Sequence, residues 1–111
     1  MDREFINEVT LQGVVGNSQV HEYAPGMLLN RFSLLTQREE KTCEGVPVVS
    51  STWHNCIAHN RPGIEDPRLI TKGTYVLLTG SMRNVGYIQP PANIPCVRTE
   101  ISVTTLRILE Q

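Results

Sequence analysis

Apolar and polar residues alternate along most of this chain, with the period of a β-strand. The first run places Val9, Leu11, Gly13 and Val15 at alternate positions, with polar residues between the first three. A period of two indicates a strand with one buried face. Gly13 and Gly16, inside and beside the run, predict a bulge or a sharp bend, which small barrels need where a strand curls.

The same pattern predicts four further strands, over residues 28–38, 48–59, 74–85 and 97–109. Turn signals separate them. Residues 17–18 are predicted to turn the chain, and residues 24–26, Ala-Pro-Gly, to turn it again after a short extended piece. The polar residues 39–47 predict an exposed hairpin loop. Residues 86–95 hold three prolines and predict a long loop.

The segment over residues 60–73 differs in character from the rest. Pro62, Gly63 and Pro67 interrupt any long helix, so at most one or two helical turns are expected. Five strands, with room for a short helix only between the third and fourth, suit the OB-fold, a five-stranded Greek-key barrel. A sandwich of this size would need about seven strands. From pattern alone, other small barrels remain open.

Length and composition restrict the class of protein. A chain of 111 residues predicts one domain over residues 1–111. No apolar run is long enough to cross a bilayer and none resembles a signal peptide, so a cytoplasmic location without a membrane partner is expected. The net charge of −1 argues against a nucleic-acid binder held mainly by charge, although it allows binding by stacking in a locally basic groove.

Signals for catalysis and metal binding are weak. The cysteines Cys43, Cys56 and Cys96 form no CxxC pair, so three reduced thiols are expected. The three histidines lack metal-ligand spacing, and the chain has no glycine-rich phosphate loop or nucleophile motif. We therefore expect neither an enzyme nor a cofactor or metal site.

Several short motifs resemble the bacterial single-stranded DNA-binding protein family, and they occur in that family's order over nearly the whole chain. Trp-His after a polar pair and Lys-Gly before a β-run are the most specific of them. The matching segments are 7–16 (NEVTLQGVVG), 31–36 (RFSLLT), 52–55 (TWHN), 72–76 (KGTYV), 79–83 (TGSMR) and 99–101 (TEI).

The resemblance implies an OB-fold, single-stranded DNA as a partner, and a role in DNA replication, recombination or repair. It also implies a homo-oligomer, a dimer or tetramer, with replication or repair proteins as further partners. Outward apolar residues such as Val48 and Ile57 fit an expected interface between copies.

Two features depart from that family's pattern. Pro62 and Pro67 interrupt the stretch where the family usually has a helix. The sequence ends at Leu109-Glu110-Gln111, directly after the last predicted strand, so we expect no C-terminal acidic tail. Both features are similar to primosomal replication protein N, a compact OB-fold relative, and a phage- or plasmid-type variant is also open.

The aromatic candidates for base stacking follow from strand parity and from the resemblance. Trp53, Asn55, Ile57 and His59 share one strand face, opposite the mostly small residues that suit a barrel interior. The family carries aromatic residues at the positions of Trp53 and His59, and often one at Tyr87. The alternative for Trp53 is a residue of the core or of an oligomer interface.

Basic residues near these candidates would contact phosphates. Each taken singly also fits a solvated surface charge, and the best placed are Arg31, Arg38, Lys41, Lys72 and Arg83. Glutamates in the hairpin over residues 39–47 oppose tight binding there. An alternative function is an OB-fold protein-interaction module, a primosome-type adaptor with weak nucleic-acid binding.

Overall fold

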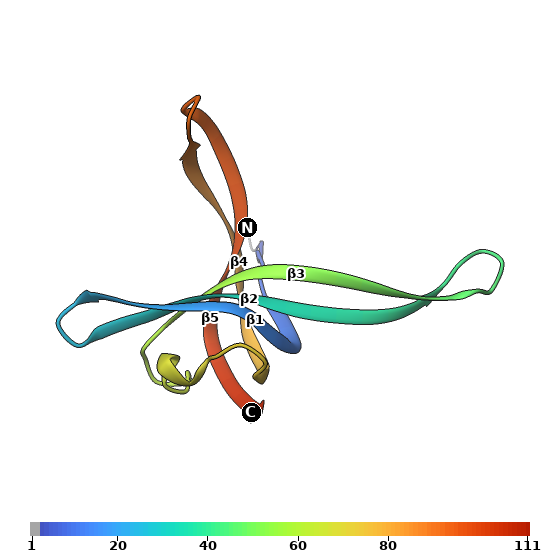
Figure 1. Ribbon diagram of the computed structural model, residues 1–111, viewed down its shortest axis with the longest axis horizontal. Coiled ribbons are helices and arrows are strands. Elements are labelled where there is room, and N and C mark those ends of the chain that lie inside the picture. The colour runs from blue at the N-terminus through green and yellow to red at the C-terminus, as the bar shows by residue number, and fades with distance from the viewer. Residues whose placement is uncertain (1–2) are drawn as a thin grey trace.

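The computed structural model describes residues 3–111, which fold as five β-strands and one short 3₁₀ turn (Figure 1). The elements in chain order are β1 (Val9–Ala24), β2 (Met27–Lys41), β3 (Pro47–His59), η1 (Pro67–Leu69), β4 (Tyr75–Gln89) and β5 (Ile94–Glu110). The expected all-β class is confirmed, and so is the expectation of little helix between the third and fourth strands.

The strands close into a barrel in the order β1-β2-β3-β5-β4. All neighbours are antiparallel except β3 and β5, which run parallel and pair only through Cys56↔Ile101 and Ile57↔Ser102. A five-stranded barrel with this connectivity is the OB-fold. The short β3–β5 contact closes the barrel and leaves the rest of β5 free to diverge from β3.

The alternating apolar positions fill the barrel interior. Phe32 and Leu34 of β2 and Cys56 and Ala58 of β3 are buried, as their strand parity predicts. With them in the core lie Val15, Ile64, Ile70, Val76, Leu78, Ile101, Val103 and Leu106.

Glycines allow the strands to cross closely where the barrel curls. β1 pairs with β4 up to Val14 and with β2 from Val14 onward, so it must bend between two neighbours. A Cβ on Gly13 would lie 2.0 Å from the carbonyl oxygen of Leu35, which only glycine avoids. The register shifts between Val15 and Ser18, next to Gly16. The predicted bend at Gly13 and Gly16 is confirmed.

The predicted strands are too short at three turns, because residues 17–18 belong to β1, residues 39–41 to β2, and residues 86–89 and 94–95 to β4 and β5. Residues 17–18 form an irregularity inside β1, which continues to Ala24 because β2 pairs with it throughout. The predicted loop over 86–95 is a paired hairpin up to Gln89↔Ile94. Pro95 has no N–H to donate. It is tolerated there because the outer edge of each strand in a two-stranded hairpin has no neighbouring strand to hydrogen-bond.

The segment between β3 and β4 is held against the barrel by polar contacts. The side-chain amide of Asn30 donates to the carbonyls of Pro67 (2.8 Å) and Ile70 (3.1 Å). Asp66 caps the 3₁₀ turn by accepting from the amide of Arg68 at 2.9 Å.

No helix in residues 3–111 is long and apolar enough to span a membrane.

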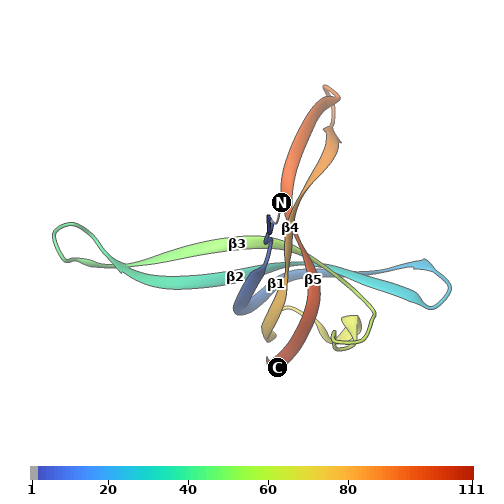
Figure 2. The same ribbon diagram turned by 180° about the vertical axis from the view of Figure 1, so that it is seen from behind.

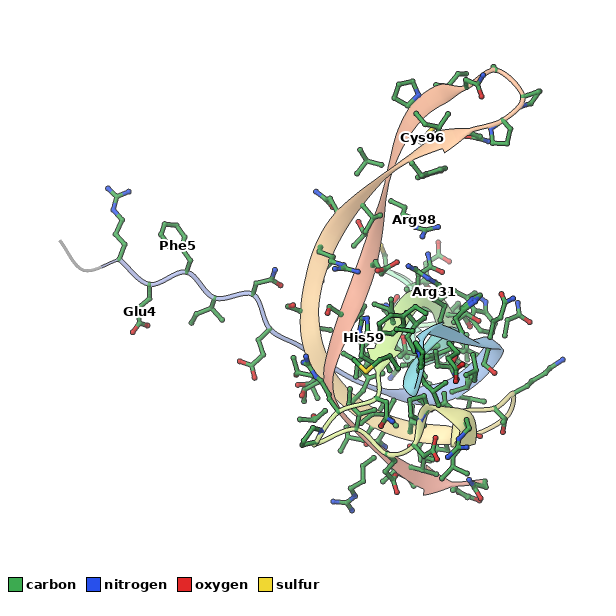
Figure 3. The ribbon with its side chains drawn as sticks, turned by 90° about the vertical axis from the view of Figure 1, so that its left-hand side faces the viewer. Glu4, Phe5, Arg31, His59, Cys96 and Arg98 are labelled. Carbon is green, nitrogen blue, oxygen red and sulfur yellow. The ribbon has the colours of Figure 1, made fainter. Side chains whose placement is uncertain are left out.

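Three hairpins extend from the barrel, as Figures 1 and 2 show. The β1–β2 and β2–β3 hairpins point in opposite directions, and the β4–β5 hairpin rises between them. The chain before β1 runs outward with Phe5 exposed, as Figure 3 shows. The side chain of Asn7 ties this segment to the backbone of Met82 through two hydrogen bonds, of 2.6 and 2.9 Å.

Candidate nucleic-acid interface

A cavity of about 390 Å³ lies where the β4–β5 hairpin leaves β3. The β1–β2–β3 side and the β5 side form its two walls, and Figure 3 shows Arg31 and Arg98 between the barrel and the hairpin. Polar side chains dominate its lining, which consists of Asn17, Ser18, Gln19, Arg31, Phe32, Ser33, Asn55, Cys56, Arg98 and Glu100.

Three arginines converge on Glu100, which lines this cavity together with Arg31 and Arg98. Arg31 Nη1 lies 2.8 Å from Glu100 Oε2, and Arg83 Nη2 lies 2.7 Å from Oε1. Arg83 Nε adds a hydrogen bond of 3.3 Å to Oε1, and Arg98 Nη2 lies 3.6 Å from Oε2. The side chain of Glu100 is only 3% exposed, whereas each arginine is nearly half exposed. The cluster of three arginines and one glutamate therefore carries a net charge of +2 beside the cavity.

The strand register explains why these residues meet. Arg83 of β4 pairs directly with Glu100 of β5, and Arg98 lies two residues before Glu100 on the same face of the strand. Arg31 comes from β2, beside Ile57 of β3, and reaches across β3 to the carboxylate. Four charged side chains from three strands are thus brought to one point. This point is the fork between β3 and β5, where the two strands diverge next to the Cys56↔Ile101 pair.

The electrostatics of the fork keep Glu100 ionised and Cys56 neutral. Burial favours the neutral form of Glu100, but hydrogen bonds from Arg83 and Arg31, together with their charges, outweigh it and lower the pKa of the carboxyl below its ordinary value. Burial and the nearby charge of Glu100 raise the pKa of the Cys56 thiol to about 12. Cys56 is therefore a protonated, unreactive thiol at neutral pH.

Tyr87 extends this cluster along the β4–β5 hairpin. The guanidinium carbon of Arg98 lies 5.7 Å from the centre of the Tyr87 ring, within cation–π range. Tyr87 is opposite Cys96 in the hairpin and shares the strand face of Arg83. Tyr87 is 40% exposed as a residue, so it remains open to a further planar group.

Trp53 lies outside the lining of the cavity, on the outer face of β3 and two residues before Asn55, which does line it. Its ring rests over Gly16 of β1, because a Cβ on that glycine would be 2.5 Å from Trp53 Cζ3. Trp53 as a residue is 59% exposed. Asn55, two residues further along β3, lines the cavity opposite Ser33, whose hydroxyl accepts from the amide of Asn17 at 2.9 Å.

His59 lies on the same face of β3 but does not line the cavity. Its ring meets Tyr23 edge to face, with centroids 5.9 Å apart, beside the β1–β2 hairpin. His59 lies six positions beyond Trp53, which is about 20 Å along a strand. Ile57 lies between them and is only 2% exposed, so the expectation that Ile57 is an exposed apolar residue is wrong. Its place between Arg31 and Ser102 in the sheet explains the burial.

The remaining predicted phosphate contacts lie outside the arginine cluster. Arg38 has the strand parity of Leu34, opposite to that of Trp53, and pairs with Glu40 at 3.7 Å. Lys72 lies in the β3–β4 connection, next to Gly73, whose amide donates to the carbonyl of Val15. The structure therefore brings together Arg31, Arg83, Asn55, Trp53 and Tyr87 along one path, and leaves Arg38, Lys72 and His59 away from the arginine cluster.

Sequence reasoning missed Arg98 and Glu100 as site residues. The available signal was their spacing of two, which places both on one face of the predicted strand that follows the one carrying Arg83. Among residues 3–111, no group of three or more His, Cys, Asp or Glu side chains could hold a metal ion. The chemistry of the path is that of cations and exposed aromatic rings.

Comparison with known proteins gives matches by structure only. No family model and no curated protein sequence matches the chain. A single-stranded DNA-binding protein of Plasmodium falciparum, solved in complex with single-stranded DNA, matches with a TM-score of 0.75 and 20% identity, over 99% of this chain and 100% of that one.

A deletion variant of the single-stranded DNA-binding protein of Thermus aquaticus matches with a TM-score of 0.73 and 16% identity. The match covers 95% of this chain but 51% of the Thermus chain, so this chain spans about half the length of that protein. The chain has the OB-fold seen in these single-stranded DNA-binding proteins.

Proposed function

We propose that this protein binds single-stranded DNA with little sequence preference and catalyses no reaction. The observation that carries the proposal is the path from Trp53 past Asn55 and the arginine cluster to Tyr87. Exposed aromatic rings stand at both ends of this path, and a net charge of +2 stands between them. Unpaired bases stack on aromatic faces and phosphates bind guanidinium groups, which is how proteins hold a single strand without reading it.

The low net charge of the whole chain is compatible with this function. The charge relevant to a bound strand is local, and the arginines gather where the cavity opens. The structural neighbours support the same function, because one of them was solved with single-stranded DNA bound. Duplex DNA should bind poorly, since its bases already stack on one another.

We also propose that the protein works in DNA replication, recombination or repair in the cytoplasm, as a homo-dimer or homo-tetramer. Exposed apolar side chains outside the path support self-association, among them Phe5, Val48 and Val97. Sedimentation at micromolar concentration tests the assembly, and a monomer would contradict it. Replication or repair proteins are the proposed further partners.

A competition experiment tests the DNA-binding proposal. Fluorescence anisotropy of a labelled oligo-dT should rise on titration with the protein, and affinity should fall as salt increases. Unlabelled oligo-dT should displace the probe far better than an equal mass of duplex. If oligo-dT shows no salt-sensitive binding, the proposal fails and a protein-interaction adaptor becomes the better account.

A further inference from the structure

Glu100 has an unusual position for an acidic residue on a surface proposed to bind a polyanion. Its carboxylate is 3% exposed, so a bound strand cannot touch it. Both carboxylate oxygens are engaged, Oε1 by Arg83 and Oε2 by Arg31 and Arg98. Charge alone makes such a residue unfavourable for DNA binding, because a negative charge beside a phosphate path repels it.

The contacts of Glu100 suggest what compensates for this repulsion. Three guanidinium groups brought to one point repel each other, and arginine side chains rotate freely unless something holds them. A carboxylate between them removes the repulsion and fixes their orientation. An arginine carries five N–H donors, and Arg31 donates one hydrogen bond to Glu100, through Nη1. The remaining donors stay available at the half-exposed rim of the cavity.

We propose that Glu100 is a positioning residue for DNA binding: it holds Arg31, Arg83 and Arg98 in place for the phosphates of a single strand. Through Arg98 it also steadies the ring of Tyr87, which lies 5.7 Å from that guanidinium carbon. One buried carboxylate thus links the phosphate contacts to one stacking surface. This inference rests on the proposed binding of single-stranded DNA.

A positioning role for Glu100 and the simple loss of one negative charge predict opposite changes in oligo-dT affinity for Glu100→Gln. Removing one negative charge about 7 Å from a phosphate in water should tighten binding about threefold. If Glu100 positions the arginines, the same substitution should instead weaken oligo-dT binding about fivefold or more. The slope of log affinity against log salt should also fall, by about 0.7 for each arginine that leaves the phosphates.

Glu39→Gln is the matched control. Glu39 is an exposed glutamate of β2 with the strand parity of Trp53, and its replacement changes the net charge by the same amount. It should bind oligo-dT as well as the unaltered protein, or up to about threefold more tightly. Glu100→Asp is the second variant, because it keeps the charge but is too short to reach all three arginines. It should also weaken binding and flatten the salt slope.

Each protein is measured below its own melting temperature, so that loss of fold does not enter the affinity. If Glu100→Gln does not fold, Glu100→Asp, which retains the counter-charge, decides the question. Unchanged or tighter binding by the Glu100 variants would overturn the positioning role while leaving the proposed function intact. Weaker binding with an unchanged salt slope would also overturn it, as that indicates a merely structural role. No binding by the unaltered protein would refute both proposals.

Discussion

Gly16→Ala should weaken binding of single-stranded DNA without unfolding the barrel. A Cβ at this position would lie 2.5 Å from Cζ3 and 2.9 Å from Cη2 of Trp53, and 2.8 Å from the hydroxyl oxygen of Ser33. Ordinary contact between carbon atoms is about 3.5–4.0 Å, so the ring must move by about 1 Å. The ring is mostly exposed and can do so, which leaves the backbone in place.

The magnitude follows from what a displaced ring loses. A base stacked on an aromatic side chain contributes about 1–3 kcal/mol, and a shift of 1 Å should cost only part of that. We expect oligo-dT affinity to fall about three- to tenfold, or about 0.7–1.4 kcal/mol. The emission of Trp53 in the free protein should change as well. Gly86→Ala is the control, since its Cβ would have a nearest neighbour at 4.0 Å.

A double-mutant cycle makes this reasoning refutable. If Gly16 acts through the indole, Gly16→Ala should change the affinity little once Trp53 is already alanine. An equal loss in both backgrounds, measured by anisotropy with oligo-dT, would mean that Gly16 acts on the strand backbone. If Gly16→Ala causes no loss of affinity in the parent protein, which keeps Trp53, the position of the indole ring is unimportant for binding.

Three further outcomes are expected. Trp53→Ala should lower oligo-dT affinity by about 1–3 kcal/mol with an unchanged salt slope and a cooperative thermal melt; parent-like affinity would make Trp53 structural. Gly80→Ala should disrupt the barrel, because its Cβ would lie 2.2 Å from the carbonyl oxygen of Ser102, and a parent-like melting temperature would contradict this. The folded-state pKa of Glu100 is lowered, so its stabilisation should be complete above its unfolded pKa of about 4.3 and be lost as pH falls through the lower folded value. Urea unfolding of the parent and Glu100→Gln should therefore give a stability difference that is constant above about pH 5 and shrinks in acid, whereas a difference independent of pH would refute the coupling.

The parts of the fold that sequence could predict depend on local pattern. Phe32 and Leu34, and likewise Cys56 and Ala58, sit inside because alternate residues of a strand share a face. The bend at Gly13 was predictable because a glycine in a strand usually marks a close approach of backbones. Prolines misled the boundaries of the β4–β5 hairpin, since their effect depends on which edge of the strand needs its amide.

The parts that sequence could not predict depend on register between strands. Ile57 has the parity of an outward residue, yet it is buried between Arg31 and Ser102 of neighbouring strands. Glu100 lies in the segment 99–101 that resembles the family, but that pattern gives no partner for its carboxylate. Its role emerges only when pairing sets Arg83 opposite it and the narrow β3–β5 contact opens a fork beside it.

In the proposed complex, bases stack on the exposed rings of Trp53 and Tyr87 while phosphates bind the arginine cluster. Titrating the protein with oligo-dT and with an abasic oligonucleotide of equal length, followed by anisotropy and Trp53 emission, separates the two contributions. We expect similar salt slopes for both oligonucleotides, with tighter binding and quenching of Trp53 for oligo-dT. Equal affinity for the two oligonucleotides with no quenching by oligo-dT would contradict it.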